Sequence, residues 1–411
     1  MPKVNAQGEV FDKKTTDFLI IGAGIIGLNL ALELKKRFSD SHVCVFEKEV
    51  KPGLHASGRN SGVLHAGFYY TSDSMKARFC REGNQHLTDY CLERGLPINR
   101  CGKLVVASDA SELSGLNELL RRGQLNGVEL VEVSESEARE IEPRVITYQK
   151  ALYSPSTATV SPSAVIKELI KDVEASGVEI RTNTTFSGCK GNIVKTSQGD
   201  IEAGYVINAA GLYADKIALN YGFSQDYRVL PFKGLFLYAG HHSAALKTNI
   251  YPAPNLEHPF LGVHFTVDVE GHTKIGPTAI PALWREQYGG MQNFSFSEMM
   301  DILSRDIGLF MGNNFGFRKV ALEELRKQSR ARMVSLAGCM VKGVDRDGYV
   351  RWGKPGIRAQ LVNIREKTLE MDFRFEGDDR SFHVLNAVSP AFTCSMPFSR
   401  YLVDEIEKLI G

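Results

Sequence analysis

The strongest constraint on the fold is an apolar run that passes through closely spaced glycines into a helix and then into a second apolar run. The segment that begins near Asp17 reads "DFLIIGAGIIGLNLALELKKRF", and "HVCVFEK" follows at residues 42–48. The first part suits a buried strand, and the apolar residues after the glycines recur with helical spacing. These features predict a strand–helix–strand unit of about thirty residues.

The glycines of this unit have the spacing GxGxxG, in which Gly22, Gly24 and Gly27 enclose Ile25 and Ile26. The first glycine permits a tight turn, the second lets a pyrophosphate approach the backbone, and the third lets helix and strand pack closely. The helix N-terminus offers free N–H groups and the positive end of its dipole to phosphates. The turn therefore predicts dinucleotide binding. A turn whose glycines are purely structural is the alternative.

An acidic residue supports the dinucleotide interpretation. Glu47 stands twenty residues after Gly27, at the end of the second predicted strand. Its carboxylate would accept hydrogen bonds from the ribose hydroxyls of the adenosine half, which argues against a 2′-phosphate there. The neighbouring Lys48 is included in the predicted cofactor site. GxGxxG alone occurs by chance, but this context makes it specific.

Later segments favour FAD over NAD. The run "YVINAAGLYADKIA" at Tyr205–Ala218 is an apolar strand that ends in small residues, including Ala210 and Gly211, before a helix. Small residues there predict a second close approach of the backbone to a ligand. Flavin reductases that bind two nucleotides carry a second GxGxxG, and this sequence has none.

Composition excludes several classes of protein. Lys and Arg number 49 against 48 Asp and Glu, so the net charge of +1 gives no general reason to expect nucleic acid. No run reaches the roughly 18 uncharged apolar residues of a membrane span. The N-terminal "MPKVNAQGEVFDKK" lacks the apolar core of a secretion signal, so we expect a cytoplasmic protein. Seven cysteines without a CxxC pair predict free thiols and no metal site.

The order of predicted elements indicates a mixed α/β or α+β fold without repeats or a low-complexity linker. Helical patterns dominate residues 294–332, whereas residues 231–276 are β-rich and aromatic, and a closing helix follows Met396. We expect a Rossmann-type FAD-binding domain interleaved with a β-rich, antiparallel-sheet substrate domain. The predicted FAD-binding domain comprises 1–85, 150–230 and 345–411, and the substrate-binding domain comprises 86–149 and 231–344.

Taken together, the motifs resemble those of the L-2-hydroxyglutarate dehydrogenase/oxidase family, within the FAD-dependent glycine/D-amino-acid oxidase superfamily. The resemblance runs from about Asp17 to Ile410. It is carried by "SGRNSGVLHAGFYY", "CGKLVVA", "INAAGLYAD", "VLPFKG", "IYPAPNLEHPFLGVHFT", "GPTAIPA", "REQYGG", "GIRAQL" and "HVLNAVSPAFT". It implies oxidation of an L-2-hydroxy acid, L-2-hydroxyglutarate or a related dicarboxylate, to the 2-oxo acid by hydride transfer to flavin N5.

Some positions depart from the family pattern. The family usually has Thr-Gly-Ile-Val-Asp where this chain has Thr157 to Ser161, Arg at Lys233, Asn at Thr278 and Pro-Ser-Pro-Ala-Ala at residues 388–392. Several of these positions should lie on the substrate side, so the substrate stays open. An amine or amino-acid oxidase or dehydrogenase of the same superfamily is one alternative, and a non-catalytic FAD-binding protein is another.

Oxidation of a hydroxy acid needs a cation for the carboxylate and a base for the hydroxyl proton. Arg358 in "KPGIRAQ" is the first candidate for the cation, because its planar fork suits a carboxylate. Lys233 is a second candidate, since a dicarboxylate would need two anchors. An arginine in a surface salt bridge and an ordinary exposed lysine are the alternatives.

Histidine is favoured as the base because its pKa lies near neutral pH. His264 occupies an alternating apolar strand pattern, where a polar residue is costly unless it has a partner. His65 is the rival, and it could instead contact the flavin or attach to it covalently. Tyr69 and Tyr70 are expected to contact substrate through their hydroxyls, with simple packing as the alternative.

The segment "GLHASGRNSGVLHAGFYY", residues 53–70, is predicted to wrap the pyrophosphate and flavin before it reaches the substrate. The start of the last helix would stabilise the anionic reduced flavin near Asn386, Ser389 and Ala391, unless it is only a helix cap. The remaining predicted cofactor contacts are Ser57, Asn60, Ser61, Gly62, Phe186 and Gly356.

The expected partners are a small 2-hydroxy acid and an electron acceptor, either oxygen or quinone. No nucleic acid partner is expected. The run "GLFMGNNFGFRKVALEELRKQSRAR" mixes apolar and basic residues as a helix at a membrane surface would, which leaves peripheral contact with the inner membrane face open. A solvated helical face is the alternative.

Overall fold

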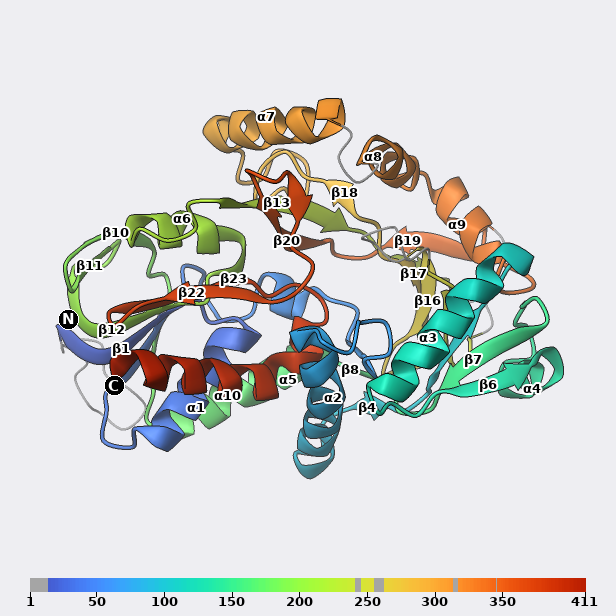
Figure 1. Cartoon of the computed structure of the whole chain (residues 1–411), viewed down its shortest axis with the longest axis horizontal. Coiled ribbons are helices and arrows are strands. Elements are labelled where there is room, and N and C mark those ends of the chain that lie inside the picture. The colour runs from blue at the N-terminus through green and yellow to red at the C-terminus, as the bar shows by residue number, and fades with distance from the viewer. Residues whose placement is uncertain (1–13, 241–244, 255–261, 313–316, 345) are drawn as a thin grey trace.

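The computed structural model describes residues 14–240, 245–254, 262–312, 317–344 and 346–411, which form two large sheets and two smaller ones (Figure 1). In the first large sheet, β1 (Thr15–Ile21) pairs in parallel with β2 (Val43–Phe46) and with β12 (Ile201–Asn208). The strand order is β10–β11–β12–β1–β2–β9, and β23 pairs with β12 and β22. The other strands of this sheet are β9 (Glu179–Arg181), β10 (Phe186–Lys190), β11 (Ile193–Thr196), β22 (Arg374–Gly377) and β23 (Ser381–Asn386).

The side chains of β1 alternate between the two faces of this sheet. Phe18 and Ile20 belong to the core between the sheet and the helices that cover one face, whereas Leu19 and Ile21 belong to the core on the opposite face. A parallel strand that is covered on both faces needs apolar residues at every position, which explains the continuous apolar run. Figure 1 shows three helices together below the sheet: α1 (Ile25–Arg37), α5 (Pro162–Ala175) and α10 (Ala391–Ile410). Two further helices, α2 (Met75–Glu93) and α6 (Ala214–Asn220), pack against α10 and β23 respectively.

The second large sheet has the order β19–β14–β17–β16–β15–β5–β7–β6 and is antiparallel except where β15 pairs with β5. Its buried apolar face includes Leu104, Ile250 and Phe265. The helices of this region are α3 (Leu113–Leu125), α4 (Glu135–Ile141) and α9 (Arg330–Gly338). The strands are β5 (Lys103–Val106), β6 (Val131–Ser134), β7 (Lys150–Ser154), β14 (Leu237–Ala239), β15 (Asn249–Pro252), β16 (His264–Val267), β17 (Thr273–Gly276) and β19 (Tyr349–Trp352).

A four-stranded sheet lies between the two large ones and carries two helices on its outer face (Figure 1). Its strands are β18 (Ile280–Pro281), β13 (Tyr227–Gly234), β20 (Gly356–Asn363) and β21 (Thr368–Leu369), and the helices are α7 (Phe296–Gly312) and α8 (Phe317–Arg326). The three-stranded sheet consists of β3 (Val63–Leu64), β8 (Ala158–Val160) and β4 (Ile98–Asn99).

The predicted fold class is confirmed, because a Rossmann-type unit is interleaved with a β-rich unit. The closing helix begins at Ala391 rather than near Met396, so Pro397 lies within its first two turns. The domain boundaries stay a prediction. The strands β7, β19 and β20 fall within the ranges assigned to the FAD-binding domain. They nevertheless pair with strands outside or at the edge of those ranges: β7 with β5 and β6, β19 with β14, and β20 with β13.

Two further properties bear on the sequence expectations. All seven cysteines are free, as predicted. Within the part of the chain that the structure describes, no helix is long and apolar enough to cross a bilayer.

Candidate functional site

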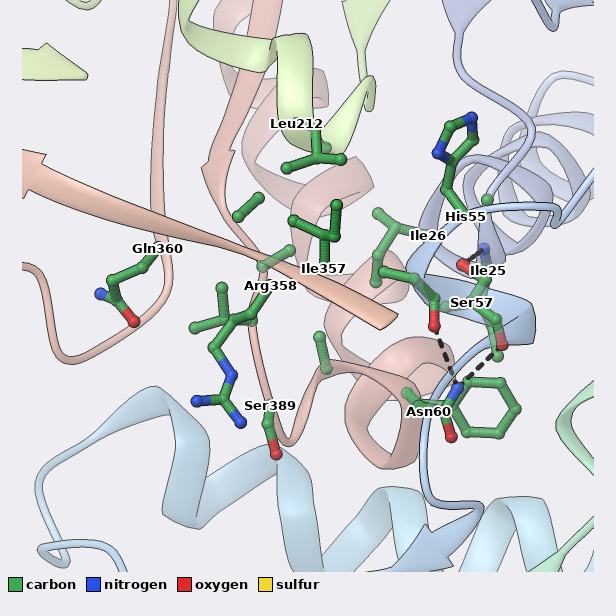
Figure 2. A pocket seen from close by; sticks show the side chains of 18 of the residues that line it. Ile25, Ile26, His55, Ser57, Asn60, Leu212, Ile357, Arg358, Gln360 and Ser389 are labelled. Carbon is green, nitrogen blue, oxygen red and sulfur yellow. Dashed lines mark hydrogen bonds between the residues drawn. The ribbon is translucent and has the colours of Figure 1, made fainter. Parts of the chain in front are cut away.

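One cavity of about 1110 Å³ extends from the glycine-rich turn after β1 to the sheet that contains β16. It opens at the carboxyl ends of β1, β2 and β12, where parallel α/β sheets bind their ligands. Figure 2 shows this cavity between the α1 side, with Ile25 and Ile26, and β20, with Ile357 and Arg358. The chain therefore brings together segments that are more than 300 residues apart.

The glycines of the turn meet different constraints. Gly22 has φ +109°, and a Cβ there would lie 2.6 Å from the Ala209 carbonyl oxygen. A Cβ on Gly27 would lie 1.9 Å from the Gly22 carbonyl oxygen, so Gly27 serves helix–strand packing and does not line the cavity. Gly24 does line it and meets only the Ser57 hydroxyl, at 3.1 Å from an added Cβ. The turn is thus a backbone cradle that side chains would fill.

Glu47 is buried and lines the cavity. Its two carboxylate oxygens accept the N–H groups of Ala23 (3.2 Å) and Glu49 (3.0 Å), which ties the end of β2 to the glycine turn. Lys48 also lines the cavity, but its ammonium group is paired with Glu49 and with Glu286 (2.6 Å). His55 Nε2 lies 2.9 Å from the same Glu49 carboxylate. Lys48 therefore belongs to an ion-pair network at one end of the cavity.

The loop after Glu47 is organised by its own polar side chains. The hydroxyl of Ser57, in the short helix η1 (Ala56–Gly58), accepts the N–H of Ile25 at the start of α1 (2.9 Å). Asn60 donates to the Ala56 and Ser57 carbonyls and accepts the Gly62 N–H (Figure 2). Ser57, Asn60 and Ser61 line the cavity, as the sequence predicted for cofactor contacts.

Gly62 is a correction to the predicted set of cofactor contacts. It does not line the cavity. Its φ is +78°, and a Cβ would lie 2.2 Å from the Val160 carbonyl oxygen. Gly62 is therefore needed for the close pairing of the β3 and β8 segments rather than for contact with a ligand.

The later segments reach the same cavity. Phe186, Ala210, Gly211 and Gly356 line it, and a Cβ on Gly356 would lie 2.4 Å from the Arg59 carbonyl oxygen. Ser389 and Ala391 also line it, at the beginning of α10. The start of α10 has no side-chain cap, and the Ala391 N–H donates to the Val388 carbonyl (3.0 Å), so the next N–H groups of the first turn are the ones that a ligand can use.

Asn386 is a second correction. Its side-chain amide donates to the carbonyl oxygens of Glu370 and Asp372 and accepts the Leu361 N–H. It is fully buried and does not line the cavity. Asn386 therefore connects neighbouring backbone segments, and α10 contributes its first turn without it.

On the substrate side, Arg358 lines the cavity from β20, and Figure 2 shows its guanidinium group directed toward Ser389. Lys233 does not line the cavity, whereas Phe232 and Gly234 on either side of it do. Alternate residues of a strand face opposite sides, so β13 directs Lys233 away from the site. The structure therefore supports a position for Arg358 beside a ligand and does not support one for Lys233.

Both candidate histidines line the cavity. His264 stacks on Tyr251, with ring centroids 3.7 Å apart, and its Nδ1 lies 2.9 Å from the Gly262 carbonyl oxygen. Because a carbonyl can only accept, Nδ1 carries the proton and Nε2 of the neutral ring is an acceptor. Burial, with further contributions from Lys103 and Arg358, lowers the pKa of His264 to about 3.

His65 is neutral for a similar reason, because burial, Lys103 and His264 hold its pKa well below the usual value. Tyr69 and Tyr70 line the cavity, and burial raises the pKa of both phenols. The Tyr69 hydroxyl is buried and has no hydrogen-bond partner among the described residues. Two neutral histidines and two phenols therefore share one wall with Arg358.

Two buried lysines were missed from the sequence. Lys103 of β5 is fully buried, and its ammonium nitrogen lies 4.9, 5.0 and 4.5 Å from the ring centroids of Phe68, Tyr69 and Tyr251. Burial lowers its pKa to about 7. Lys76 of α2 is buried and lines the cavity. The available signal was a lysine inside an apolar pattern, in "CGKLVVA" and "MKARFC".

The donor set fits a flavin dinucleotide. The cradle at Gly22 and Gly24 leaves room for a pyrophosphate beside the start of α1. Glu47 lies where a ribose is expected, and the uncapped start of α10 suits the negative charge that a reduced flavin develops.

Comparison with known proteins agrees with this geometry. The sequence pattern of a family described as FAD dependent oxidoreductase matches residues 17–405. The L-2-hydroxyglutarate dehydrogenase of Escherichia coli K12 is 34% identical over 96% of this chain and 94% of its own length. The human mitochondrial L-2-hydroxyglutarate dehydrogenase is 32% identical over 95% of this chain and 89% of its own length.

Solved structures share the fold. The FAD-bound L-alpha-glycerophosphate oxidase of Mycoplasma pneumoniae aligns with a TM-score of 0.77 at 20% identity, covering 96% of this chain and 95% of its own. The glycine oxidase of Geobacillus kaustophilus aligns with a TM-score of 0.70 at 19% identity, covering 96% and 95%. At these identities the likeness concerns the fold alone.

Proposed function

Because the chain belongs to the FAD-dependent oxidoreductases and, within them, to the L-2-hydroxyglutarate dehydrogenase family, we propose that it oxidises L-2-hydroxyglutarate or a related L-2-hydroxy dicarboxylate to the 2-oxo acid. The observation that carries the proposal is the shared wall of Arg358, His65, His264 and Tyr70, which a small anionic substrate can reach. FAD supplies the hydride acceptor when it is bound.

The residues of this wall have complementary tasks. Arg358 binds the carboxylate next to the reacting carbon through its planar fork, in a buried setting where such a contact is strong. His264 accepts the hydroxyl proton at Nε2, since its Nδ1–H is held by the Gly262 carbonyl. His65, beside it, is the alternative acceptor. Both rings are neutral at neutral pH, so each has an unprotonated nitrogen that can accept a proton.

The cofactor and substrate are tested by spectroscopy. The purified protein is expected to show flavin absorbance, which L-2-hydroxyglutarate bleaches under anaerobic conditions. The variant Arg358→Met is expected to raise KM for the hydroxy acid roughly 100-fold, and Arg358→Lys to recover part of that loss. Bleaching by amino acids alone would favour an amine or amino-acid substrate. Bleaching by no substrate at all would favour a non-catalytic FAD-binding protein.

We also propose that the protein is cytoplasmic and contacts a membrane peripherally. Its electron acceptor would be quinone or oxygen. Support comes from α7 and α8, where exposed apolar side chains lie beside exposed basic ones. The apolar residues are Phe296, Met300, Ile307, Phe310, Met311, Leu322 and Leu325, and the basic ones include Arg318, Lys319 and Arg326. Such a surface suits an anionic bilayer.

Vesicle flotation tests the membrane contact. The protein is expected to float with vesicles that contain anionic lipid and to remain in solution with neutral ones. A Phe296→Ser, Met311→Ser variant should lose flotation and keep its activity with a soluble electron acceptor. Equal recovery of both proteins with the vesicles would contradict the assignment of this surface.

A further inference from the structure

We propose that Lys76 binds the second carboxylate of the substrate and makes this site selective for dicarboxylates. The inference rests on the proposed oxidation of a 2-hydroxy acid and identifies the residue that selects the substrate class. It replaces the anchor predicted at Lys233, which the structure places outside the cavity.

The position of Lys76 is unfavourable for the fold. It is the second residue of α2 and only 6% exposed. A cation in the first turn opposes the helix dipole, and a buried ammonium group is costly unless it is paired. Neither helix formation nor packing explains a lysine at this site. A ligand that carries negative charge does.

The surroundings of Lys76 leave its charge unneutralised. Its ammonium nitrogen lies 5.9 Å from the Tyr70 ring and 5.8 Å from the Phe373 ring. Among the described residues, this ammonium nitrogen makes no hydrogen bond and no ion pair. Asp372 is nearby, but its carboxylate accepts the N–H groups of Met75 (2.8 Å), Lys76 (3.1 Å) and Phe373. That carboxylate therefore caps the start of α2.

Three other cations that line the cavity are already paired with carboxylates. Lys48 contacts Glu286 at 2.6 Å, and Lys216 contacts Glu298 at 2.7 Å. Arg122 contacts Glu118 at 2.8 Å. Lys76 differs from these three residues because no carboxylate of the described chain lies within ion-pair distance of it.

Lys76 and Arg358 both interact with Tyr70. The Tyr70 ring faces the Lys76 ammonium group, and the Arg358 charge lowers the pKa of the Tyr70 phenol against the effect of burial. Burial lowers the pKa of Lys76 to about 8, with a smaller contribution from the Arg358 charge and against the opposing effects of Asp372 and Glu370. A dicarboxylate would contact both groups, with Arg358 at the reacting end and Lys76 at the far end. A monocarboxylate would leave Lys76 buried and unpaired.

The variant Lys76→Met tests this role, because methionine keeps the apolar stem and removes the charge. We expect KM for L-2-hydroxyglutarate to rise roughly 10- to 100-fold, while KM for the monocarboxylate L-2-hydroxybutyrate changes little. Glutarate, which has no hydroxyl to oxidise, provides a readout independent of turnover. Its binding, measured by calorimetry on the flavin-loaded protein, should weaken by a similar factor. Lys76→Arg should retain most of the preference.

Lys233→Met is the matched comparison, since Lys233 is a half-buried lysine of β13, the strand that pairs with β20. It should leave glutarate binding unchanged. Equal losses for both substrates in Lys76→Met, or unchanged glutarate binding, would overturn the inference. A wild-type protein that oxidises no hydroxy acid would refute the proposed function instead, and glutarate binding would still decide the role of Lys76. Flavin content and melting temperature report whether each variant is folded.

Discussion

The glycines of the β1–α1 turn, which share one motif, are required for different reasons. At position 27 a side chain would collide with neighbouring backbone, because an added Cβ would lie 1.9 Å from the Gly22 carbonyl oxygen. At position 24 a side chain would instead occupy space needed by a ligand, since an added Cβ meets only the Ser57 hydroxyl and the open cavity. The motif predicted both roles from the sequence, and the structure distinguishes them atom by atom.

Gly24→Ala and Gly27→Ala should therefore fail in different ways. Gly24→Ala is expected to fold with a melting temperature near that of the wild type but to retain much less flavin. Gly27→Ala should lose about 1 to 3 kcal/mol of stability or more, because overpacking against backbone cannot relax easily. Thermal unfolding and the flavin-to-protein absorbance ratio distinguish the two. A stable, flavin-free Gly27→Ala protein would contradict this division.

At the scale of elements, α7 has an acid on its buried face. Ile302 and Leu309 pack with Phe232 of β13 and Val362 of β20, and Asp306 falls between them at helical spacing. Burial raises the pKa of Asp306 from 3.8 to about 7, against the smaller effect of Arg305. The sequence predicted a helix here, but helical periodicity alone could not show that the sheet of β13 and β20 covers this face.

Asp306→Asn should stabilise the protein in a pH-dependent way. The folded chain holds the carboxyl proton more tightly than the unfolded chain, so the wild type loses stability as pH rises from about 4 to about 7. Asparagine has no such loss. The gain in unfolding free energy of Asp306→Asn over the wild type should therefore be absent below about pH 4 and grow between about pH 4 and pH 7. Above that range it should stay constant at about 1 to 3 kcal/mol. Melting temperatures at pH 4, 6 and 8 check the trend, which a pH-independent difference would refute.

At the scale of the whole molecule, a buried ion pair joins the segment before α7 to the FAD-binding side. Arg285 is 1% exposed and contacts both carboxylate oxygens of Asp215 in α6, at 2.7 and 2.8 Å. The Asp215 carboxylate also accepts the backbone N–H of Val229 in β13. The carboxylate of Glu298 in α7 accepts the backbone N–H of Arg285. One pair thus connects α6, β13 and α7 behind the cavity.

Removing one partner of this pair should be worse than removing both. Asp215→Ala is expected to cost about 3 to 5 kcal/mol, because it leaves the Arg285 charge buried and unpaired. The double variant Asp215→Leu, Arg285→Met should cost clearly less. Thermal unfolding of the single variants Asp215→Leu and Arg285→Met and of the double variant forms the measurement. Additive losses would show that the two residues act independently.

The sequence predicted the parts of the site that are local or lie in a recognisable motif. The glycine turn, Glu47, the loop with Ser57 and Asn60, Arg358 and the two histidines all line one cavity, as expected from their motifs. Local motifs succeed because a turn, a cap or a strand end is specified by residues close together in the chain.

The sequence by itself determined the strand–helix–strand unit, the choice of FAD and the family. Only the tertiary structure decided which lysine faces the substrate. Lys233 and Lys76 both stand beside apolar residues, and nothing local distinguishes them. Strand alternation in β13 directs Lys233 away, whereas the packing of α2 on α10 places Lys76 beside Tyr70 and Phe373. Which charge is buried without a partner depends on contacts between distant segments, and these exist only once the chain has folded.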